Sequence, residues 1–396
     1  MVAVTGAASA IGTAVLTALA SPPEPAAGGA ATGGAATGGA VARTVALDEV
    51  RGPVDGPVWK IGPLDVPDVV DRLRGADVVV HVAHQTDLAA VTAVPARARR
   101  AHAVRVTQAV TTAAAAVGAR GLVVVSSALV LGARPDNPVP LPDDAPVAAP
   151  TDDGLVGDLL EVEAVLAAAV RAHPGLRVVV LRPAPVVGPG VDTIVTRHFE
   201  APRLLTLRGQ EMRWQFCHVD DLAAAVRLVV DDLLDPLPPP RQRFARPAVG
   251  SAGVPAEGPA GGSVAGPVTL TVGSPGSLSS DDVERISGMR RIEVPAAMAF
   301  ATAERLHRVG VLPAPAGDLA YVVHPWVVAA AGLLDAGWAP SRTNEECLAV
   351  LLDGVRGRHA VVGRRLGTRD AAMGAAGAAV AVIGTAALVR RARSRR

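Results

Sequence analysis

The sequence predicts an α/β protein built on a doubly wound parallel sheet, and three observations lead to this prediction. Short apolar runs of strand length alternate with longer segments of helical length over the first half of the chain. The first apolar run leads into a turn of small residues at positions 5–12 (TGAASAIG), and the second run ends at an acid, Asp48. Strands that alternate with helices place a parallel sheet between two helical layers, which is an arrangement of Rossmann type.

Each strand is expected at a continuous apolar run, because a parallel strand is buried on both faces. The expected strands are residues 2–5, 44–47, 78–82, 122–126 and 178–181. The expected helices between them are residues 11–20, 66–73, 101–117 and 157–172. A smaller, helix-rich part follows, with helices expected at residues 220–234, 280–287 and 296–309. We therefore predict a Rossmann domain over residues 1–182, a substrate part over residues 183–355 and a separate C-terminal segment over residues 356–396.

Two internal segments have the composition of insertions rather than of packed structure. Residues 21–40 repeat Gly, Ala and Thr without an apolar period, and residues 236–267 are rich in Pro and Gly. We expect the first to be a flexible insertion within the Rossmann domain. The second is expected to be a disordered insertion within the substrate part.

The composition excludes some classes of function. The 396 residues are 50% hydrophobic and carry a formal net charge of +1, so the overall charge does not indicate a nucleic-acid partner. Cys217 and Cys347 lie far apart without metal-binding or redox spacing, and no metal is expected. Such cysteines fit a reducing compartment, and residues 2–6 have the pattern of a strand and a glycine turn rather than of a secretory signal. We expect a cytoplasmic protein.

The turn at residues 5–12 has the features of a phosphate-binding turn. Gly6 permits the tight turn after the strand, and Gly12 lets the following helix pack closely on the sheet. The free N–H groups at the start of that helix are expected to bind a pyrophosphate. Ser9 stands at the middle position, where a glycine usually lets the backbone approach the phosphates, so the approach is less close here. The turn predicts a dinucleotide, and the alternative is a small-residue turn without a nucleotide.

Asp48 is expected to accept hydrogen bonds from the adenosine ribose hydroxyls. An acid at this place disfavours the additional phosphate of NADP, so NAD is predicted as the cofactor and NADP is less favoured. The separation of Gly6 and Asp48 exceeds the usual spacing of about 20–30 residues, and the insertion at residues 21–40 accounts for the excess. The alternative is that Asp48 is an ordinary acid of a loop.

Further motifs follow in a fixed order along the chain. They are LD at 64–65, ADVVVHVA at 76–83, VVVSS at 123–127, RP at 182–183 with GPG at 188–190, FCHVDDLA at 216–223 and GWAP at 337–340. With these motifs and the turn, the sequence resembles the extended short-chain dehydrogenases/reductases, the NAD-dependent epimerase/dehydratase group, over roughly residues 1–350. The resemblance implies a set of residues that line NAD: Gly6, Ser9, Ile11, Gly12, Asp48, Asp65, Val66, Val82, Ala83 and Ser126. It also implies that the hydroxyl of Ser127 polarises a substrate carbonyl.

The catalytic pair of that family is missing from this chain. The family places a Tyr and, four residues later, a Lys on the helix after the serine, and the Lys lowers the pKa of the Tyr. With Glu163 aligned to the acid that usually follows, these positions are Leu155 and Leu159. The only tyrosine is Tyr321 and the only lysine is Lys60, so no such pair exists elsewhere. The usual proton relay is therefore absent, and whether the chain is an enzyme stays open.

Three functions remain as alternatives. The favoured one is an NAD-binding protein with altered or absent oxidoreductase chemistry. The second is an active oxidoreductase or epimerase with non-standard acid and base residues, for which Asp158 is the first candidate and the other candidates are Glu161, His84, His198 and His218. Of these, His84 is expected in a structural hydrogen bond and His218 behind the site. The third is a structural remnant that no longer binds a nucleotide.

A substrate or effector pocket is expected around Arg197, His198, Arg213 and Trp214, because Arg binds phosphate or carboxylate in a bidentate manner. In sugar-nucleotide enzymes of the family a pocket Arg precedes the Phe by two residues. Trp214 holds that place here, so a nucleotide sugar is not predicted and the small molecule stays unnamed. The alternative is that these arginines only carry surface charge. A homodimer is a possible assembly.

The C-terminal segment predicts a membrane anchor. Residues 371–389 are uncharged and close to the ~20 residues that cross a bilayer as a helix, and arginines flank them on both sides. We expect a single anchoring helix that holds the nucleotide-binding domain at the inner face of the cell membrane. The segment consists mostly of Ala and Gly, which enter lipid less favourably than Leu. The alternatives are therefore a helix docked on the soluble domain and a disordered tail.

Overall fold

The computed structural model describes residues 1–21, 43–148, 154–235, 244, 266–308, 316–358, 360–361 and 364–365. Nearly all of the insertions expected at 21–40 and 236–267 lie outside these residues, and so does the whole of the segment 371–389. Within the described part of the chain, no helix is long and apolar enough to cross a membrane.

A sheet of seven parallel strands forms the centre of the molecule, in the order β11-β6-β5-β4-β1-β2-β3. Its strands are β1 (Val2–Thr5), β2 (Thr44–Asp48), β3 (Val58–Ile61), β4 (Val78–Val82), β5 (Gly121–Val125), β6 (Arg177–Pro183) and β11 (Val268–Val272). The chain runs outward from β1 to β3, crosses back to β4 and then runs outward in the opposite direction. This reversal between β1 and β4 confirms the predicted doubly wound arrangement. The edge strands β3 and β11 were not predicted.

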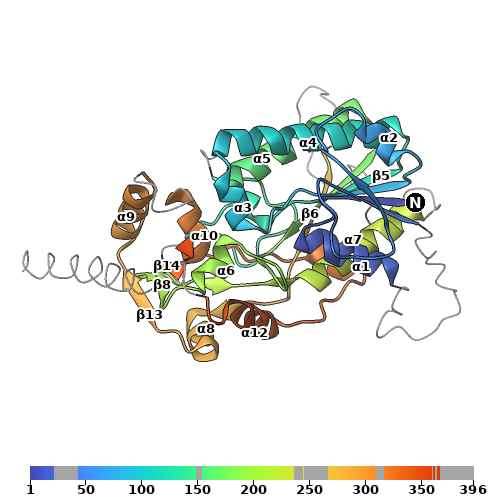
Figure 1. The fold of residues 1–396 in the computed structure, drawn as a ribbon. Coiled ribbons are helices and arrows are strands. Elements are labelled where there is room, and N and C mark those ends of the chain that lie inside the picture. Colours follow the sequence, from blue (N-terminus) through green and yellow to red (C-terminus); the bar gives the residue numbers. More distant parts are fainter. Residues whose placement is uncertain are drawn as a thin grey trace, which may run out of the picture.

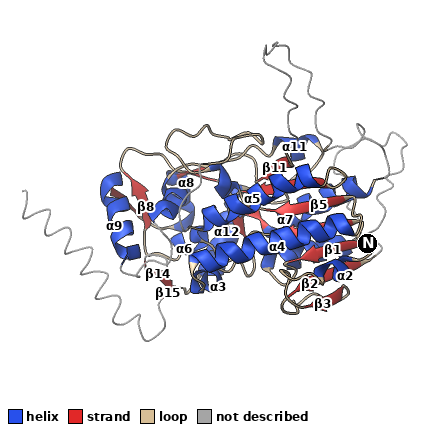
Figure 2. Cartoon of the chain, turned by 90° about the horizontal axis from the view of Figure 1, so that it is seen from above, coloured by secondary structure: helices blue, strands red, loops and turns tan. Residues whose placement is uncertain are grey.

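Helical layers cover both faces of the sheet (Figures 1 and 2). The helices α2 (Val69–Leu73), α4 (Ala96–Ala116) and α5 (Leu155–Ala172) lie on one face, and α1 (Ala10–Ala20) and α7 (Val219–Leu234) lie on the other. Alternate residues of each strand enter the two layers, so Val79 packs with the first layer and its neighbours Val78 and Val80 pack with the second. Each fully buried Val or Leu contributes about 1.5–3 kcal/mol, which explains why both faces must be covered.

The helix α4 begins earlier than expected, at Ala96. Pro95 precedes it with φ −55°, a value that suits the start of a helix. The first turn is rich in arginine and has no apolar period, so periodicity alone did not indicate it. The helix α2, in contrast, begins after the expected residue 66, beyond Pro67.

The remaining described elements form the smaller part of the molecule and its connections. They are α3 (Leu88–Ala93), η1 (Ala128–Leu131), β7 (Val186–Val187), α6 (Ile194–His198), β8 (Leu204–Leu207), β9 (Arg213–Trp214), β10 (Cys217–His218), β12 (Leu278–Ser279), α8 (Ser280–Ser287), β13 (Arg291–Val294), α9 (Ala296–Arg308), η2 (Ala316–Leu319), α10 (Ala320–Val323), α11 (Ala331–Asp335), α12 (Asn344–Val355), β14 (Ala360–Val361) and β15 (Arg364–Arg365). Three short strand pairs, β10-β7, β12-β9 and β13-β8, hold this part together.

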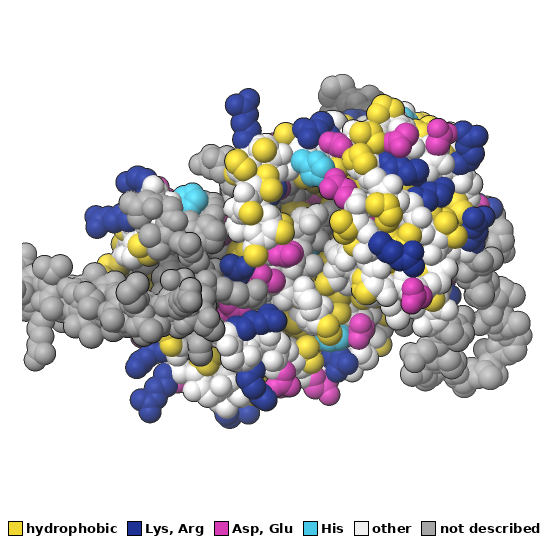
Figure 3. Space-filling model, in the orientation of Figure 1, with side chains coloured by type: hydrophobic (Ala, Val, Ile, Leu, Met, Phe, Trp, Pro, Cys, Tyr) yellow, Lys and Arg dark blue, Asp and Glu magenta, His cyan; other side chains and the backbone are white. Residues whose placement is uncertain are grey.

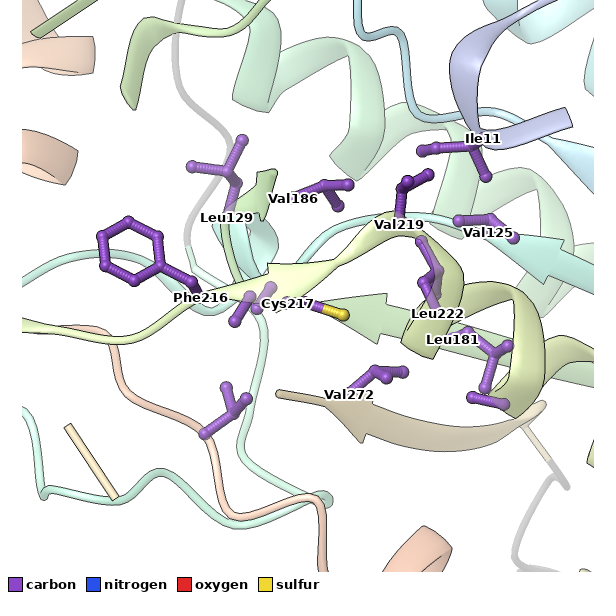
Figure 4. Packing of buried hydrophobic residues seen from close by; sticks show 14 of the residues in the cluster. Ile11, Val125, Leu129, Leu181, Val186, Phe216, Cys217, Val219, Leu222 and Val272 are labelled. Carbon is purple, nitrogen blue, oxygen red and sulfur yellow. The ribbon is translucent and has the colours of Figure 1, made fainter. Parts of the chain in front are cut away.

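One hydrophobic core continues from the sheet into the smaller part. Figure 4 shows Val125 and Leu181 of the sheet near Val219 and Leu222 of α7, with Phe216 farther along. Hydrogen bonds connect segments that are distant in the sequence: the Trp338 indole N–H donates to the carbonyl of Asp221, at 3.1 Å. Two of the sequence motifs therefore contact each other and stabilise the fold. On the surface, acidic and basic side chains are interspersed over the visible face (Figure 3).

Candidate functional site

The carboxyl ends of the central strands bring most of the predicted cofactor residues to one edge of the sheet. Thr5 is in register with Leu47 of β2 and with His81 of β4, and Val82 is in register with Val125 of β5. The residues that end these strands or follow them, Gly6, Asp48, Val82, Ala83 and Ser126, therefore lie at the same edge. This edge borders the reversal between β1 and β4, where open α/β sheets bind their ligands.

The turn after β1 leaves no room for side chains at its two glycines. Gly6 has φ +72°, and a Cβ added there would lie 2.9 Å from the carbonyl oxygen of Val82. A Cβ on Gly12 would lie 2.3 Å from the carbonyl oxygen of Gly6 and 2.7 Å from the Cα of Ala7. Both glycines are therefore needed for α1 to start close to the sheet.

Ser9 caps α1 and holds the turn closed. Its Oγ accepts a hydrogen bond from the Gly12 N–H at 3.0 Å and donates one to the Gly6 carbonyl at 2.7 Å. The first N–H groups of a helix have no intrahelical partner, so those of Ala10 and Ile11 remain for an anion at this end of α1. Ala10 was not among the predicted residues, although its place after a capping serine is the signal that identifies it. The Ile11 side chain is buried in the core (Figure 4).

Asp48 is oriented by the turn itself. Its Oδ2 accepts a hydrogen bond from the Ala8 N–H at 2.8 Å, and its Oδ1 accepts one from the Glu49 N–H at 2.7 Å. A carboxylate oxygen accepts more than one hydrogen bond, so both oxygens keep capacity for ribose hydroxyls. Gly52 packs against the same turn, because a Cβ there would lie 3.0 Å from the Cα of Ala8.

Asp65 and Val66 follow β3, beyond the central strand ends. The Asp65 Oδ2 lies 3.2 Å from the Nε of Arg105 and 3.5 Å from the Nδ1 of His102. The hydrogen bond from Arg105 lowers the pKa of Asp65. The carboxylate is therefore engaged with side chains of α4, and Val66 is partly buried beside it.

Ser126 belongs to a buried polar network rather than to an open surface. Its hydroxyl donates to the Oε1 of Glu163 at 2.7 Å. Arg182 donates to both oxygens of Glu163, at 3.2 and 2.7 Å. These contacts join β5, α5 and β6. Glu163, the acid used to align the helix, and Arg182 of the RP motif are therefore partners in one network.

Ser127 is buried and caps the short helix η1. Its Oγ accepts a hydrogen bond from the Leu129 N–H at 3.3 Å. A serine that accepts through its oxygen still has its own O–H to donate. The hydroxyl predicted to polarise a carbonyl therefore keeps a proton to donate.

A cavity of about 70 Å³ lies between the end of β4 and the starts of α3, α4 and α5. Leu155 and Leu159, which stand at the Tyr and Lys positions of the family resemblance, are part of its wall. The other aliphatic residues of the wall are Leu88, Val91, Leu129, Val162 and Ile194. Its polar or charged residues are His84, Gln85, Arg99, Asp158, Asp192 and Thr193.

Asp158, the candidate acid or base, lines this cavity but is engaged with two arginines. Its Oδ2 accepts from the Nε of Arg99, and its Oδ1 accepts from the Nε of Arg100 at 3.1 Å. Glu161, the other acid on this helix, is exposed. The structure thus places Asp158 at the site with its charge balanced, and Glu161 away from it.

The histidines near the site are neutral or structural. Burial lowers the pKa of His84, in the cavity wall, to about 4. Its imidazole is therefore uncharged near neutral pH. Burial also lowers the pKa of His81 to about 4, and its ring contacts the hydroxyls of Thr5 at 2.9 Å and Thr107 at 3.3 Å. His218 caps α7, since its Nδ1 accepts from the Asp220 N–H at 3.2 Å.

The four predicted substrate residues are not part of the cavity wall. Arg197 is buried and donates to both oxygens of Asp192, at 2.9 and 2.7 Å, and Asp192 is a residue of the cavity wall. His198 stacks on Trp214 with ring centroids 5.4 Å apart, and burial lowers its pKa to about 4. Arg213 pairs with Glu211 at 2.7 Å on the partly exposed side of β9.

Two side chains from late in the sequence, Asp318 and Tyr321, contact residues of the cavity wall, and the sequence did not indicate them. The Tyr321 hydroxyl donates to the carbonyl of Leu129 at 2.8 Å, and burial raises its pKa. The buried Asp318 accepts a hydrogen bond from the N–H of Leu155, and burial raises its pKa to about 6. Its Oδ2 has no hydrogen-bond partner in the described part of the chain. Both residues belong to short helices in a segment without a clear apolar period.

No group of three or more His, Cys, Asp or Glu side chains among the described residues is arranged to hold a metal ion.

Comparison with protein families matches residues 2–237 to the family described as the NAD dependent epimerase/dehydratase family. Uncharacterized proteins from Mycobacterium tuberculosis and Mycobacterium bovis are 32% identical over 107 residues. That stretch covers 27% of this chain and only 28% of the length of these relatives.

Several solved structures have a similar fold. A UDP-glucose-4-epimerase from Stenotrophomonas maltophilia with bound NAD has a TM-score of 0.59 at 17% identity, over 90% of this chain and 97% of that one. A dTDP-glucose 4,6-dehydratase from Streptomyces venezuelae, also with NAD bound, has a TM-score of 0.57 at 18% identity, over 90% and 96%. At these identities the comparison supports the fold alone.

Proposed function

Because the chain belongs to the NAD-dependent epimerase/dehydratase family, we propose that it binds NAD at the switch-point edge of its sheet and has altered or lost the oxidoreductase chemistry of that family. The proposal has two parts, binding and chemistry, which rest on different residues.

The residues at the edge fit a dinucleotide. The N–H groups of Ala10 and Ile11 would hold the pyrophosphate, and the absence of a Cβ at Gly6 and Gly12 keeps the start of α1 close to the strand ends. Asp48 would bind the adenosine ribose. When bound, NAD supplies a nicotinamide ring that accepts or returns a hydride. Solved structures of similar fold that carry NAD support the proposal that this chain binds NAD.

NAD is the preferred form because a carboxylate stands where NADP carries its 2′-phosphate. Asp48 is held beside the turn by the N–H groups of Ala8 and Glu49, so it cannot swing away without losing two hydrogen bonds. Like charges at hydrogen-bond distance repel each other strongly, and the phosphate is the mobile partner. We expect NADP to bind more weakly by at least about tenfold.

The observation that carries the second part is the presence of Leu155 and Leu159 in the cavity wall. A leucine neither donates nor accepts a proton, so the ordinary proton relay has no counterpart at these positions. The polar groups nearby are poor substitutes, since Asp158 is bound by two arginines and burial makes His84 a weak base with a pKa of about 4. Ser127 keeps a hydroxyl proton to donate.

The free hydroxyl proton of Ser127 favours the alternative function, an enzyme with non-standard acid and base residues. One assay distinguishes NAD binding without turnover from enzymatic activity. The full chain is incubated with NAD and a panel of alcohols and nucleotide sugars while NADH absorbance is followed. We expect no turnover in the wild-type chain. Robust turnover that Ser127→Ala abolishes would overturn the proposal in favour of the enzyme. Failure of the chain to bind either nucleotide would favour a structural remnant.

For the remaining chain we propose the organisation inferred from the sequence: a substrate part at 183–355 and an anchoring segment at 371–389. The anchor is tested by fractionating cells that express the full chain or a chain that ends at Arg356. We expect only the full chain in the membrane fraction. Equal recovery of both chains in the soluble fraction would exclude the anchor.

A further inference from the structure

We infer that the cavity bounded by Leu129, Leu155 and Leu159 binds an uncharged, apolar group of a small ligand, such as a short branched alkyl group, rather than a sugar ring. The inference rests on the proposed function in one respect, since it takes the cavity as the ligand site next to the dinucleotide. It names the chemical class of that ligand, which the family relationship does not supply.

The wall of the cavity is mainly aliphatic. Leucines from η1 and α5 meet Ile194 at the start of α6, while α3 contributes Leu88 and Val91. Transfer of an apolar group from water to such a surface is favourable in proportion to the area that it buries. An apolar cavity of this kind in a protein takes up hydrocarbon-like ligands.

The charged groups of the wall already have ion-pair partners, two of which, Arg100 and Arg197, lie outside the wall. Asp158 is held by Arg99 and Arg100, and Asp192 is held by Arg197 through two hydrogen bonds. These pairs have side chains that are at most about a quarter exposed. An anionic ligand that recruited Arg99 would leave the buried Asp158 with Arg100 as its remaining arginine partner, which is unfavourable.

The uncharged polar groups are too few for a sugar. His84 is neutral because burial lowers its pKa to about 4, and it offers one donor and one acceptor. The Thr193 Oγ1 accepts from the Thr196 N–H at 3.3 Å as the cap of α6 and keeps its own O–H to donate, and the exposed Gln85 supplies one amide. A hexose brings several hydroxyls, and each one that is buried without a partner weakens binding. An apolar group carries no such requirement.

The volume points the same way. The cavity holds about 70 Å³. A cavity of about 150 Å³ is known to accommodate benzene, so roughly half of that volume suits a smaller branched alkyl group.

The experiment uses the full chain with 13C-labelled Leu, Val and Ile methyl groups, followed by NMR during titration with isobutyramide and, separately, with glucose. Isobutyramide carries a branched alkyl group and no charge, and glucose is the polar probe. We expect isobutyramide to shift the methyl signals of Leu155, Leu159 and Ile194 in a saturable way, and glucose to leave them unchanged.

A matched pair of variants on α4 tests the location. Ala103 lines the cavity, whereas Ala101 is exposed on the same helix, so Ala103→Leu fills the cavity and Ala101→Leu does not. Both changes keep a good helix former. We expect Ala103→Leu to weaken isobutyramide binding at least about tenfold, a change of about 1.4 kcal/mol, and Ala101→Leu to leave it unchanged.

Glucose shifts at the same methyls, no saturable shifts with isobutyramide, or equal binding in the Ala103→Leu variant would each overturn the inference. Binding of NAD, measured by calorimetry on the same sample, separates the two claims. Isobutyramide binding without NAD binding refutes the proposed function alone. NAD binding without isobutyramide binding refutes the apolar ligand alone.

Discussion

Replacing Asp318 by Asn should stabilise the protein at neutral pH, which is unusual for a buried hydrogen-bonded residue. Asp318 is 6% exposed, and its burial raises the pKa of its carboxyl from the ordinary 3.8 to about 6. Its Oδ2 has no partner in the described part of the chain, although the other groups around it include Leu155, Arg99 and Asp158. Asn keeps an oxygen to accept the Leu155 N–H and removes the charge.

The expected change in the free energy of unfolding follows from the raised pKa of Asp318. A group whose folded pKa lies above its unfolded pKa contributes its full stability below the unfolded value and loses it as the pH rises through the folded value. For Asp318 the loss therefore runs from about pH 4 to about pH 6. At about 1.4 kcal/mol per pH unit, the charged form costs about 3 kcal/mol above pH 6, and Asp318→Asn should recover up to that amount.

Urea unfolding of both chains between pH 4 and pH 8 measures the effect. We expect the difference in the free energy of unfolding to be near zero at pH 4 and to reach its plateau above pH 6. A difference independent of pH, or a wild-type chain that is more stable at pH 8, would refute the reasoning. Asp282→Asn is a control of opposite sign, because hydrogen bonds from Ser279 and Arg285 lower the pKa of Asp282 to about 2. That change should destabilise the chain above pH 4 and lose its effect in stronger acid.

Three further substitutions have defined outcomes. Asp48→Ala should weaken NAD binding and reduce the preference for NAD over NADP, as measured by calorimetry. Unchanged affinities for both nucleotides would show that Asp48 is not part of the site. Gly12→Ala should lower the free energy of unfolding by about 1–3 kcal/mol, because its Cβ would lie 2.3 Å from a backbone oxygen. Gly175→Ala is its control, since nothing lies within 4 Å of a Cβ there, and equal urea midpoints for the two would contradict the packing argument. Glu163→Ala should lower the free energy of unfolding by about 3–5 kcal/mol by leaving Arg182 buried without its partner, and a loss below about 1 kcal/mol would show that the pair is not coupled.

The sequence predicted the parts of the fold that depend on local patterns. Strands buried on both faces are continuous apolar runs, so β1, β4 and β5 were found almost to the residue. The edge strand β3 has exposed or half-buried residues throughout, so its pattern is too weak to identify. The strand β11 follows a Pro- and Gly-rich segment and enters the sheet beside β6, a pairing that no local pattern indicates.

The candidate site was predictable where it depends on the turn after β1 and on the acid that ends β2. The hydrogen bonds and ion pairs of the other site residues depend on tertiary contacts that the sequence does not indicate. Ser126 is still expected to line NAD, and the bond from its hydroxyl to Glu163, which lies on another element, is not visible in the sequence. The charge of Asp158 is balanced by arginines on α4, a helix whose first turn was not predicted. Asp318 reaches Leu155 from far along the chain, and only the folded structure brings them together.

Whether the chain binds NAD is decided by a calorimetric titration of the full chain with NAD and with NADP under identical conditions. We expect a saturable heat with one NAD per chain and an affinity for NADP that is lower by at least about tenfold. The absence of saturable heat with NAD, or tighter binding of NADP, would contradict this expectation.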